Sequence, residues 1–397
     1  MRALVLGYGR SGKAAEALLK TQGAEAVVLA DDARDRLGDG NFDFAVVSPG
    51  IALTHPWVVE AKRRGIPLKS ELQLGCEELK RQGWKLLAVT GSKGKSSVVK
   101  VVADAIDGVP CGNYGLPVCE VALSSDSRSS SDSRWAVVEV SSFMMETTEL
   151  PADMFEAAAI LNLQEDHLDR HGSVEVYHGL KRKLLSFAKR GLGPDATGMS
   201  RPLWTGSYFD NEILAENAAM AVELMRVAGL DDAKIAAAFK AFAPLPHRMN
   251  LVAEIGGVRY IDDSKATSLA ALIAGVKMAS TGTQTLKHSN TQTILLVAGG
   301  LPKGDDPKTA LSVLTERVKK VYLIGQSAEA FFAAWSGAVD CEICGTMDRA
   351  VETARREAEK GETVLLSPGT ASFDQFKSYG ERGEVFTRLV KEKGQPK

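Results

Sequence analysis

The stretch LLAVTGSKGKSSVVKVV, residues 86–102, joins an apolar run to a glycine-containing turn and then to a helix-like pattern. Gly91 and Gly94 allow the backbone to curl, so that successive N–H groups can point at phosphate oxygens. Lys95 would place a positive charge on those phosphates. The common phosphate-loop pattern G-x-x-x-x-G-K-[ST] has a glycine where this chain has Val89. The strand before the turn and the helix after it nevertheless favour a phosphate site over a simple turn.

A phosphate loop also needs ligands for magnesium, and three segments offer them. Ser96 follows the loop lysine, and Glu139 ends the apolar run in WAVVEVSSF. A glutamate in a buried strand is costly unless it is paired or metal-bound, so Glu139 is predicted to be functional. The loop LNLQEDHLDRHGS carries Asp166 and His167, and this histidine is either a magnesium-site ligand or a surface residue. His167 and His171 are four apart without an H-E-x-x-H pattern, which disfavours a zinc protease.

The rest of the chain is typical of an α/β protein. Continuous apolar runs such as ILLVAGG, KVYLIGQ and VLLSPGT are typical of strands buried on both faces of a parallel sheet. Helical stretches between them predict repeated βαβ units. We therefore expect three domains, each with a mostly parallel sheet flanked by helices: a Rossmann-like domain at 1–84, a P-loop ATPase-like domain at 85–247 and a second Rossmann-like domain at 248–397.

The first block carries a G-x-G-x-x-G pattern, formed by Gly7, Gly9 and Gly12 between a strand and a helix. Asp31 and Asp32 follow about twenty residues later, as in dinucleotide-binding proteins. The pattern itself predicts only that an anion can sit at the helix N-terminus. A nicotinamide-dependent dehydrogenase is one hypothesis, and a tight turn for helix packing is another. The dehydrogenase leaves GKS and Glu139 unexplained.

Composition limits the partners and the compartment. The 397 residues carry a net charge of −2, which gives no reason to expect a nucleic-acid or membrane-surface partner. No apolar run approaches the roughly 20 residues of a spanning helix. The short apolar start, MRALVLGYGR, lacks the features of a signal peptide, and the five cysteines fit reduced thiols. We expect a cytoplasmic protein.

Polar loops follow three predicted strands of the last block. Asp263, Lys265 and Thr267 lie in YIDDSKATS, Lys303 follows ILLVAGGLP, and Ser372 lies in LLSPGTASFDQF. Ligands in open α/β sheets bind beyond the carboxyl ends of the strands. The three loops together predict a second substrate pocket.

These stretches together resemble the Mur ligases, over nearly the whole chain. The SPGTASFDQF stretch is similar to a signature of the branch that adds D-glutamate, and folate polyglutamate ligases share the central block but lack the first domain. The motifs that carry the resemblance are SPGI (48–51), GSKGKSS (91–97), GNYGLP (112–117), EVSSFMMETT (139–148), LNLQEDHLDRHG (161–172), LPHR (245–248), DDSKATS (262–268) and LLSPGTASFDQFKSYGERG (365–383).

The resemblance implies an ATP-dependent amide-forming ligase of peptidoglycan precursor synthesis, and hence a role in cell-wall formation, cell shape and cell division. ATP would phosphorylate the alanyl carboxylate of UDP-N-acetylmuramoyl-L-alanine, and the amine of D-glutamate would attack the acyl phosphate. Both steps need positioning and charge neutralisation rather than a protein nucleophile. The alternatives are a variant that adds L-glutamate and a catalytically impaired homologue that only binds the UDP-sugar. A monomer is expected.

The resemblance also assigns roles to residues, which fall into four sets. The ATP set is Gly91, Ser92, Lys93, Gly94, Lys95, Ser96, Ser97, Asn113, Asn217, Arg248 and Asp263. The UDP-substrate set is Gly7, Gly9, Arg10, Ser11, Asp31, Asp32, Ser48, Pro49 and Gly50. The glutamate set is Lys265, Thr267, Lys303, Ser372, Phe373 and Tyr379. Two Mg²⁺ ions would be held by Ser96, Glu139, His167 and a carbamate formed from Lys181 and CO₂, and the catalytic residues would be Lys95, Glu139, His167 and Lys181.

Four details of the sequence bear on these assignments. Only a neutral amine adds CO₂, so the carbamate requires a lowered lysine pKa, and Lys183 is the alternative to Lys181. The stretch 190–216 is shorter than in the family, so an antiparallel subsheet of the central domain is expected to be trimmed or lost. Asn217 stands in I-L-A-E-N without its usual partners, and Ser97 replaces a threonine.

Overall fold

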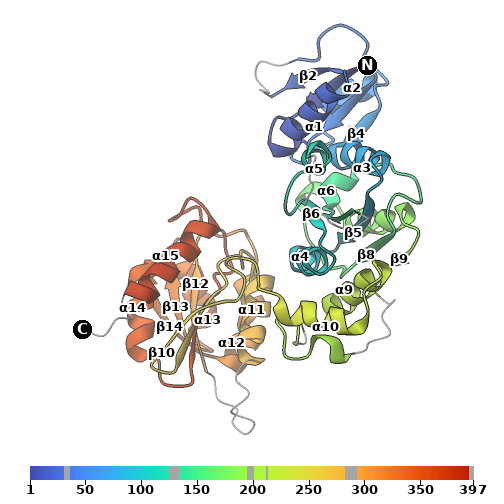
Figure 1. Cartoon of the computed structure of the whole chain (residues 1–397). Coiled ribbons are helices and arrows are strands. Elements are labelled where there is room, and N and C mark those ends of the chain that lie inside the picture. Colours follow the sequence, from blue (N-terminus) through green and yellow to red (C-terminus); the bar gives the residue numbers. More distant parts are fainter. Residues whose placement is uncertain (31–35, 125–133, 195–200, 212, 282–292, 393–397) are drawn as a thin grey trace. The chain divides into compact units, whose positions relative to one another are not determined.

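The chain divides into two compact units, Met1–Phe242 and Ala243–Lys397, whose elements are labelled in Figure 1. In the residues that the structure describes, the strands form three sheets, two in the first unit and one in the second. The structure is a computed structural model, and it describes residues 1–30, 36–124, 134–194, 201–211, 213–281 and 293–392.

The first sheet is fully parallel, with strand order β2-β1-β3-β4. Its central strand β1 leads into α1 through the glycine turn, and α2 and α3 follow β3 and β4 along the chain. The Ser70 hydroxyl caps α3 by accepting a hydrogen bond from the backbone of Gln73. The elements are β1 (Arg2–Leu6), α1 (Arg10–Thr21), β2 (Glu25–Leu29), β3 (Phe44–Val47), α2 (Pro56–Arg63), β4 (Leu68–Ser70) and α3 (Glu71–Arg81).

The second sheet is also parallel, with strand order β6-β7-β5-β8-β9. Its five strands are β5 (Lys85–Thr90), β6 (Val109–Gly112), β7 (Trp135–Glu139), β8 (Ala157–Ile160) and β9 (Gly191–Leu192). Its helical elements are α4 (Lys95–Ala105), α5 (Val118–Leu123), α6 (Ser142–Met145), α7 (Leu168–His171), α8 (Val174–Lys183), η1 (Leu184–Phe187), η2 (Arg201–Trp204), α9 (Ala215–Val227) and α10 (Asp232–Ala241).

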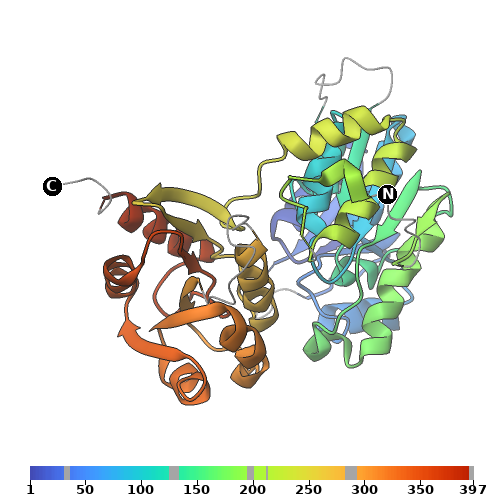
Figure 2. The ribbon, with the colours of Figure 1, turned by 90° about the horizontal axis from the view of Figure 1, so that it is seen from below.

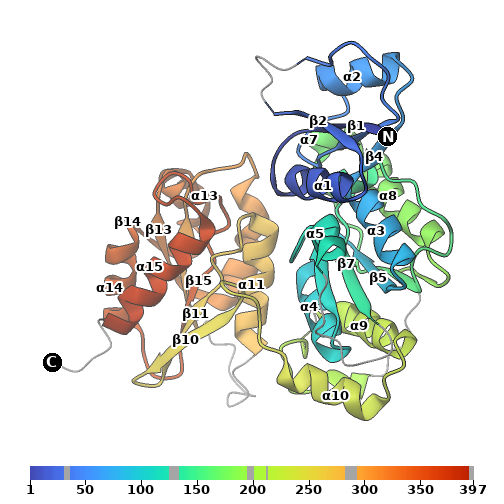
Figure 3. The same cartoon turned by 45° about the horizontal axis from the view of Figure 1, so that its top comes forward.

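One hydrophobic core joins these two sheets. It contains Val5 and Leu18 from the first sheet's layer together with Leu86 and Val138 from the second. Helices α1, α3 and α5 pack against one another between the sheets, as Figure 3 shows. Because burial of a shared apolar core stabilises the whole assembly, the two sheets belong to one compact unit.

The second unit is built on one six-stranded sheet of order β10-β11-β15-β12-β13-β14. Alternate residues of each strand pack on opposite faces: Leu296 contacts the layer of α11, α12 and α13, whereas Leu295 contacts the layer of α14 and α15. Figure 2 shows helices on both sides of this sheet. The elements are β10 (Asn250–Ile255), β11 (Val258–Asp262), α11 (Leu269–Thr281), β12 (Ile294–Gly299), η3 (Pro307–Ala310), α12 (Leu311–Arg317), β13 (Val318–Ile324), α13 (Ala328–Trp335), β14 (Asp340–Gly345), α14 (Met347–Glu357), β15 (Thr363–Leu366) and α15 (Tyr379–Glu392).

The predicted fold class is confirmed, because the sheets are parallel except for β10, which pairs with β11 in antiparallel orientation. In the described part of 190–216, the structure has β9 and the short helix η2, and no antiparallel strand pair. Among the described residues, no helix is both long enough and apolar enough to cross a membrane.

Candidate functional site

The turn between β5 and α4 requires glycine at two positions. Gly91 and Gly94 have φ values of +154° and +81°, which residues other than glycine rarely adopt. A Cβ atom on Gly94 would lie 2.0 Å from the side-chain nitrogen of Asn217. The backbone therefore curls tightly around the N-terminus of α4, which no side chain caps. Such an open helix N-terminus is a site for anions.

Hydrogen bonds connect this turn to the segment that follows β8. The Asn162 side chain accepts a hydrogen bond from the backbone of Lys93 at 2.8 Å and donates one back to its carbonyl at 2.9 Å. The Ser92 hydroxyl donates to the carbonyl of Gln164 at 2.9 Å. Asn162 also donates to buried Asn217 at 3.2 Å. Asn217, which the resemblance assigns to the ATP set, thus lies in the network that holds the loop.

Two lysines converge on the loop backbone. The ammonium groups of Lys95 and Lys181 donate to the carbonyl of Gly91, at 2.7 Å and 3.0 Å. Lys181 is 2% exposed. Burial lowers its pKa to about 7, assisted by the charge of Lys95 and opposed by Asp166 and Glu139. The ring of Tyr177 lies 4.5 Å from the Lys181 ammonium.

Lys183, the alternative carbamate lysine, is placed differently. It is partly exposed and forms an ion pair with Glu149 at 2.5 Å, on the outside of α8. Only a neutral amine adds CO₂, and burial of the kind found at Lys181 favours the neutral form. The structure therefore gives Lys181, and not Lys183, the surroundings that a carbamate needs.

Glu139 uses only one of its two carboxylate oxygens in a hydrogen bond. Its side chain is 1% exposed, and Oε1 accepts a hydrogen bond from the Asn113 side chain at 2.7 Å. Oε2 is buried and has no hydrogen-bond partner. A buried carboxylate oxygen without a partner is costly, and a hard cation such as Mg²⁺ would satisfy it. Glu139 therefore fits the predicted magnesium site.

His167 lies at the start of α7 with a left-handed backbone, φ 52°. Its side chain is 46% exposed, and its ring lies 4.9 Å from that of Phe143 and 6.1 Å from that of Tyr177. Within the described residues, no group of three or more His, Cys, Asp or Glu side chains is arranged to hold a metal ion. The predicted ligand set differs from such a cluster, because it also uses the hydroxyl of Ser96 and the modified Lys181.

The glycine turn of the first sheet forms a compact pair with the SPGI turn. The Ser48 hydroxyl donates to the carbonyl of Gly7 at 2.9 Å, and a Cβ atom on Gly12 would lie 2.0 Å from that same carbonyl. Gly9 precedes α1 without a side-chain cap, so this helix N-terminus is open to an anion. Ser11, Pro49 and exposed Gly50 lie at the same two turns, and Arg10 donates to the carbonyl of Gly115 at 3.4 Å. Asp31 and Asp32 lie outside the described residues.

In the second unit, the three predicted loops lie together. They follow β11, β15 and β12, which are neighbours in the sheet. Leu301 and Ala371 form an antiparallel bridge, and the backbone of Gly369 donates to the carbonyl of Ala266 at 2.9 Å. The predicted convergence of these loops at one edge of a single sheet is thus confirmed.

The side chains at this edge are partly open to solvent. The Lys265 ammonium lies 3.8 Å from the centre of the Tyr379 ring, Lys303 is exposed, and Phe373 is 70% exposed. Ser372 is buried and Thr267 half-buried. The edge therefore combines two cations with exposed aromatic rings, which suits a small dicarboxylate.

Asp263 and Arg248, both predicted nucleotide contacts, belong to the second unit. Asp263 accepts a hydrogen bond from the Ser367 hydroxyl at 2.9 Å. Burial raises its pKa to about 7, against the opposing effects of Ser367 and the charge of Arg248. The carboxylate packs against α11, where a Cβ atom on Gly275 would lie 2.5 Å from it.

Two residues that organise the sites were not predicted from the sequence. The Tyr177 hydroxyl donates a hydrogen bond to the Ser92 hydroxyl at 3.2 Å and so joins α8 to the phosphate loop. Arg382 is 0% exposed and donates to the carbonyls of Ser264, Thr370 and Ala371, which fastens two of the three loops together. Arg382 lies in one of the family motifs, and Tyr177 lies four residues before Lys181. Their roles became visible only from their contacts with residues that are distant in sequence.

Comparison with known proteins agrees with this geometry. The Mur ligase middle domain family matches residues 89–192, and the family described as Mur ligase, glutamate ligase domain matches residues 247–369. The chain is 33% identical to the UDP-N-acetylmuramoylalanine–D-glutamate ligase of Acidobacterium capsulatum, over 98% of this chain and 96% of that protein.

Solved structures share the fold at low sequence identity. The UDP-N-acetylmuramate-alanine ligase MurC of Thermotoga maritima has a TM-score of 0.58 at 15% identity, with 99% of this chain and 100% of that chain covered. The MurF ligase of the same organism, solved in complex with ADP, has a TM-score of 0.56 at 15% identity and covers 92% and 98%. The similarity extends over all three sheets. The chain belongs to the Mur ligase family.

Proposed function

We propose that this protein is an ATP-dependent ligase that joins D-glutamate to UDP-N-acetylmuramoyl-L-alanine in peptidoglycan precursor synthesis. The observation that carries the proposal is the phosphate loop at 91–95, where the ammonium groups of Lys95 and Lys181 meet at one carbonyl beside an open helix N-terminus. The near-full-length relative that bears this activity in its name supports the choice of substrates.

In the first step, a carboxylate oxygen of the alanyl group attacks the γ-phosphorus of ATP, and ADP leaves. The backbone N–H groups of the loop and the N-terminus of α4 would hold the phosphates, and Lys95 would turn from the Gly91 carbonyl to the phosphate oxygens. Bound Mg²⁺ would supply further neutralisation of phosphate charge, with Ser96, Glu139, His167 and carbamylated Lys181 as its ligands.

In the second step, the amine of D-glutamate attacks the acyl carbon, and phosphate leaves with the oxygen that came from the carboxylate. The second unit would hold D-glutamate, with Lys265 and Lys303 facing its carboxylates and Ser372, Phe373, Thr267 and Tyr379 around it. The role of the protein is to position the amine and to neutralise charge, so no protein nucleophile is needed.

The remaining assignments complete the proposal. The glycine turn and the SPGI turn of the first sheet would bind the UDP part, and residues 1–84, 85–247 and 248–397 would act as three functional domains. Arg248, Asp263 and Asn113 are proposed to serve the nucleotide. All five cysteines are free thiols, which supports a reducing, cytoplasmic location. We propose a monomer.

An omission assay tests the proposal. Phosphate release is measured with purified protein, Mg²⁺, ATP, UDP-N-acetylmuramoyl-L-alanine and D-glutamate, and then with each component left out. Release that requires all of them supports the ligase, and D-glutamate replaced by L-glutamate identifies the accepted enantiomer. Binding of the UDP-sugar without any release would instead indicate a homologue that has lost catalysis.

A further inference from the structure

Arg170, on the helix that follows His167, contacts the first sheet. Its Nη2 group donates to the carbonyl of Ile51 at 2.8 Å, and the carbonyl of Pro49 lies 3.5 Å away. These two carbonyls flank Gly50, the exposed tip of the SPGI turn. The contact spans 119 residues of sequence and links the proposed UDP-sugar turn to the loop that carries a proposed magnesium ligand.

The same guanidinium forms a two-point ion pair with Glu146. Arg170 Nε donates to Oε1 at 3.0 Å and Nη2 donates to Oε2 at 2.6 Å, and the side chains are 16% and 8% exposed. Paired, planar contacts of this kind fix the orientation of both groups. Arg170 also lies over the ring of Phe143, 5.0 Å from its centre.

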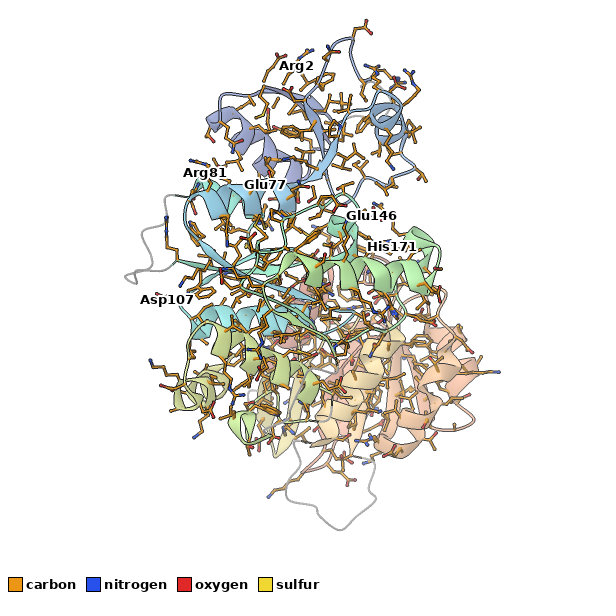
Figure 4. All side chains as sticks on the ribbon, turned by 90° about the vertical axis from the view of Figure 1, so that its right-hand side faces the viewer. Arg2, Glu77, Arg81, Asp107, Glu146 and His171 are labelled. Atoms are coloured by element: carbon orange, nitrogen blue, oxygen red, sulfur yellow. The ribbon has the colours of Figure 1, made fainter. Side chains whose placement is uncertain are left out.

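Glu146 extends this arrangement to the end of β7. Its carboxylate lies 3.3 Å from His171 Nδ1, and the other ring nitrogen of His171 forms a hydrogen bond with the Ser142 hydroxyl at 3.0 Å. Figure 4 shows Glu146 and His171 next to each other. Burial lowers the pKa of His171, so the negative charge of Glu146 is balanced by Arg170.

Two of the proposed magnesium ligands, Glu139 and His167, adjoin this cluster. Ser142 is three residues after Glu139, and the backbone N–H of Arg170 donates to the carbonyl of His167 at 3.1 Å. The Phe143 ring contacts the His167 ring, 4.9 Å between centres, while it also supports Arg170. A short chain of packed and hydrogen-bonded groups therefore joins the SPGI turn to the His167 loop.

We propose that Arg170 is a positioning residue that couples the SPGI turn to the His167 loop, so that binding of the UDP-sugar and binding of magnesium–ATP strengthen each other. The inference rests on the proposed function, because it takes its two ligands from it. A sugar nucleotide that orders the turn would fix the carbonyls of Pro49 and Ile51, and these would hold Arg170 and the loop in one orientation. By linkage, the coupling must be the same in both directions.

The test is calorimetric titration of Mg²⁺ with the non-hydrolysable ATP analogue AMP-PNP, with and without saturating UDP-N-acetylmuramoyl-L-alanine. We expect the sugar nucleotide to tighten AMP-PNP binding at least about fivefold in the wild type. In Arg170→Lys, the ammonium keeps the ion pair with Glu146 but cannot reach the turn in the same geometry, and the enhancement should fall below about twofold.

Two further variants separate coupling from folding. Arg170→Met combined with Glu146→Gln removes both charges, so that no buried carboxylate is left without a partner, and it should also lose the enhancement. Arg81→Met is the control for loss of a two-point ion pair, because Arg81 pairs with Glu78 in the same way on α3, and Figure 4 shows Arg81 on the opposite side from Glu146 and His171. It should keep the wild-type enhancement.

The outcomes are distinct. A wild type that binds both ligands without mutual enhancement, or Arg170 variants that retain it, would overturn the coupling role. If Arg170 had only a structural role, its variants would have lower thermal stability or weaker affinities for AMP-PNP and for the UDP-sugar. The enhancement of one affinity by the other ligand would stay at the wild-type value. A wild type that shows the coupling but no ligation would refute the proposed function alone, and one that does not bind the UDP-sugar would refute both.

Discussion

Carbamylation of Lys181 is open to a direct chemical test. The perturbation is the supply of ¹³C-labelled bicarbonate to protein prepared without CO₂, followed by ¹³C NMR of the carbamate carbon. With a pKa of about 7, roughly half of the Lys181 amine is neutral at pH 7. An ordinary lysine of pKa about 10.4 is neutral in roughly one molecule in 2,500. Burial therefore raises the reactive fraction about 10³-fold.

The lowered pKa of Lys181 also determines how its reaction with CO₂ depends on pH. At constant dissolved CO₂, the neutral fraction of a group with a pKa of about 7 rises roughly tenfold between pH 6 and pH 8 and then levels off. The neutral fraction of an ordinary lysine would rise roughly a hundredfold over the same interval. Because carbamylation of a neutral amine releases a proton, the neutral fraction governs the initial rate of carbamate formation and not its final amount. We expect one carbamate signal whose initial rate of formation follows the first profile.

Matched variants assign the signal. Lys181→Met should abolish it, and Lys183→Met, which removes the exposed lysine paired with Glu149, should leave it unchanged. Ligation by Lys181→Ala should be strongly impaired and partly rescued by a small added carboxylate, which would replace the carbamate as an anionic ligand. A signal that survives in Lys181→Met and disappears in Lys183→Met would assign the carbamate to Lys183. Wild-type ligation by Lys181→Ala would show that the reaction does not need a carbamate at Lys181.

Four further results are expected. Lys95→Ala should abolish ATP-dependent ligation with an unchanged circular dichroism spectrum, and an active variant would exclude the assigned role. Gly94→Ala should weaken ATP binding more than about tenfold in calorimetry, because the new Cβ would lie 2.0 Å from Asn217 and φ is +81°; equal affinity would contradict the loop geometry. Arg382→Met should destabilise the chain by about 3 kcal/mol in urea unfolding and raise the KM for D-glutamate, since three loop carbonyls each lose a hydrogen bond; unchanged values would show that the loops hold without it. In CO₂-free buffer, wild-type stability should rise relative to Lys181→Met as pH increases from about 7 to about 10.5, because over this window the unfolded chain binds the proton that folded Lys181 has lost; parallel stability curves would contradict the lowered pKa.

The local parts of the fold and the site were predictable from the sequence. Gly91 and Gly94 mark a turn that only glycine allows, and continuous apolar runs mark strands that are buried on both faces. The ends of β11, β12 and β15 could be placed at one edge because parallel strands bring their carboxyl ends together. These features depend on a few neighbouring residues and on the rules of sheet topology.

The contacts that fix the side chains were not predictable in this way. Three side chains form hydrogen bonds with backbone groups that are distant in sequence: Asn162, Arg170 and Arg382. The residues around each of them in the sequence do not indicate its partner. The fastening of Asn217 to the phosphate loop depends on how α9 packs beside it. Such pairings emerge only when the packed core brings the segments together.

The shared hydrophobic core explains a difference between the expected domains and the compact units of the structure. The sequence predicts separate blocks at 1–84 and 85–247, whereas the structure has one compact unit through residue 242. Apolar side chains of α1, α3 and α5 form a continuous core between the two sheets. Periodicity shows which face of a helix is apolar, but it does not tell which neighbour covers that face.

Transfer of oxygen from substrate to phosphate is the direct signature of an acyl-phosphate intermediate. UDP-N-acetylmuramoyl-L-alanine labelled with ¹⁸O in the alanyl carboxylate is incubated with the protein, Mg²⁺, ATP and D-glutamate, and the phosphate released is analysed by mass spectrometry. An acyl-phosphate ligase must deliver one ¹⁸O atom to each phosphate, matched by one amide product. Phosphate without ¹⁸O, or phosphate formed without the amide, would contradict the account.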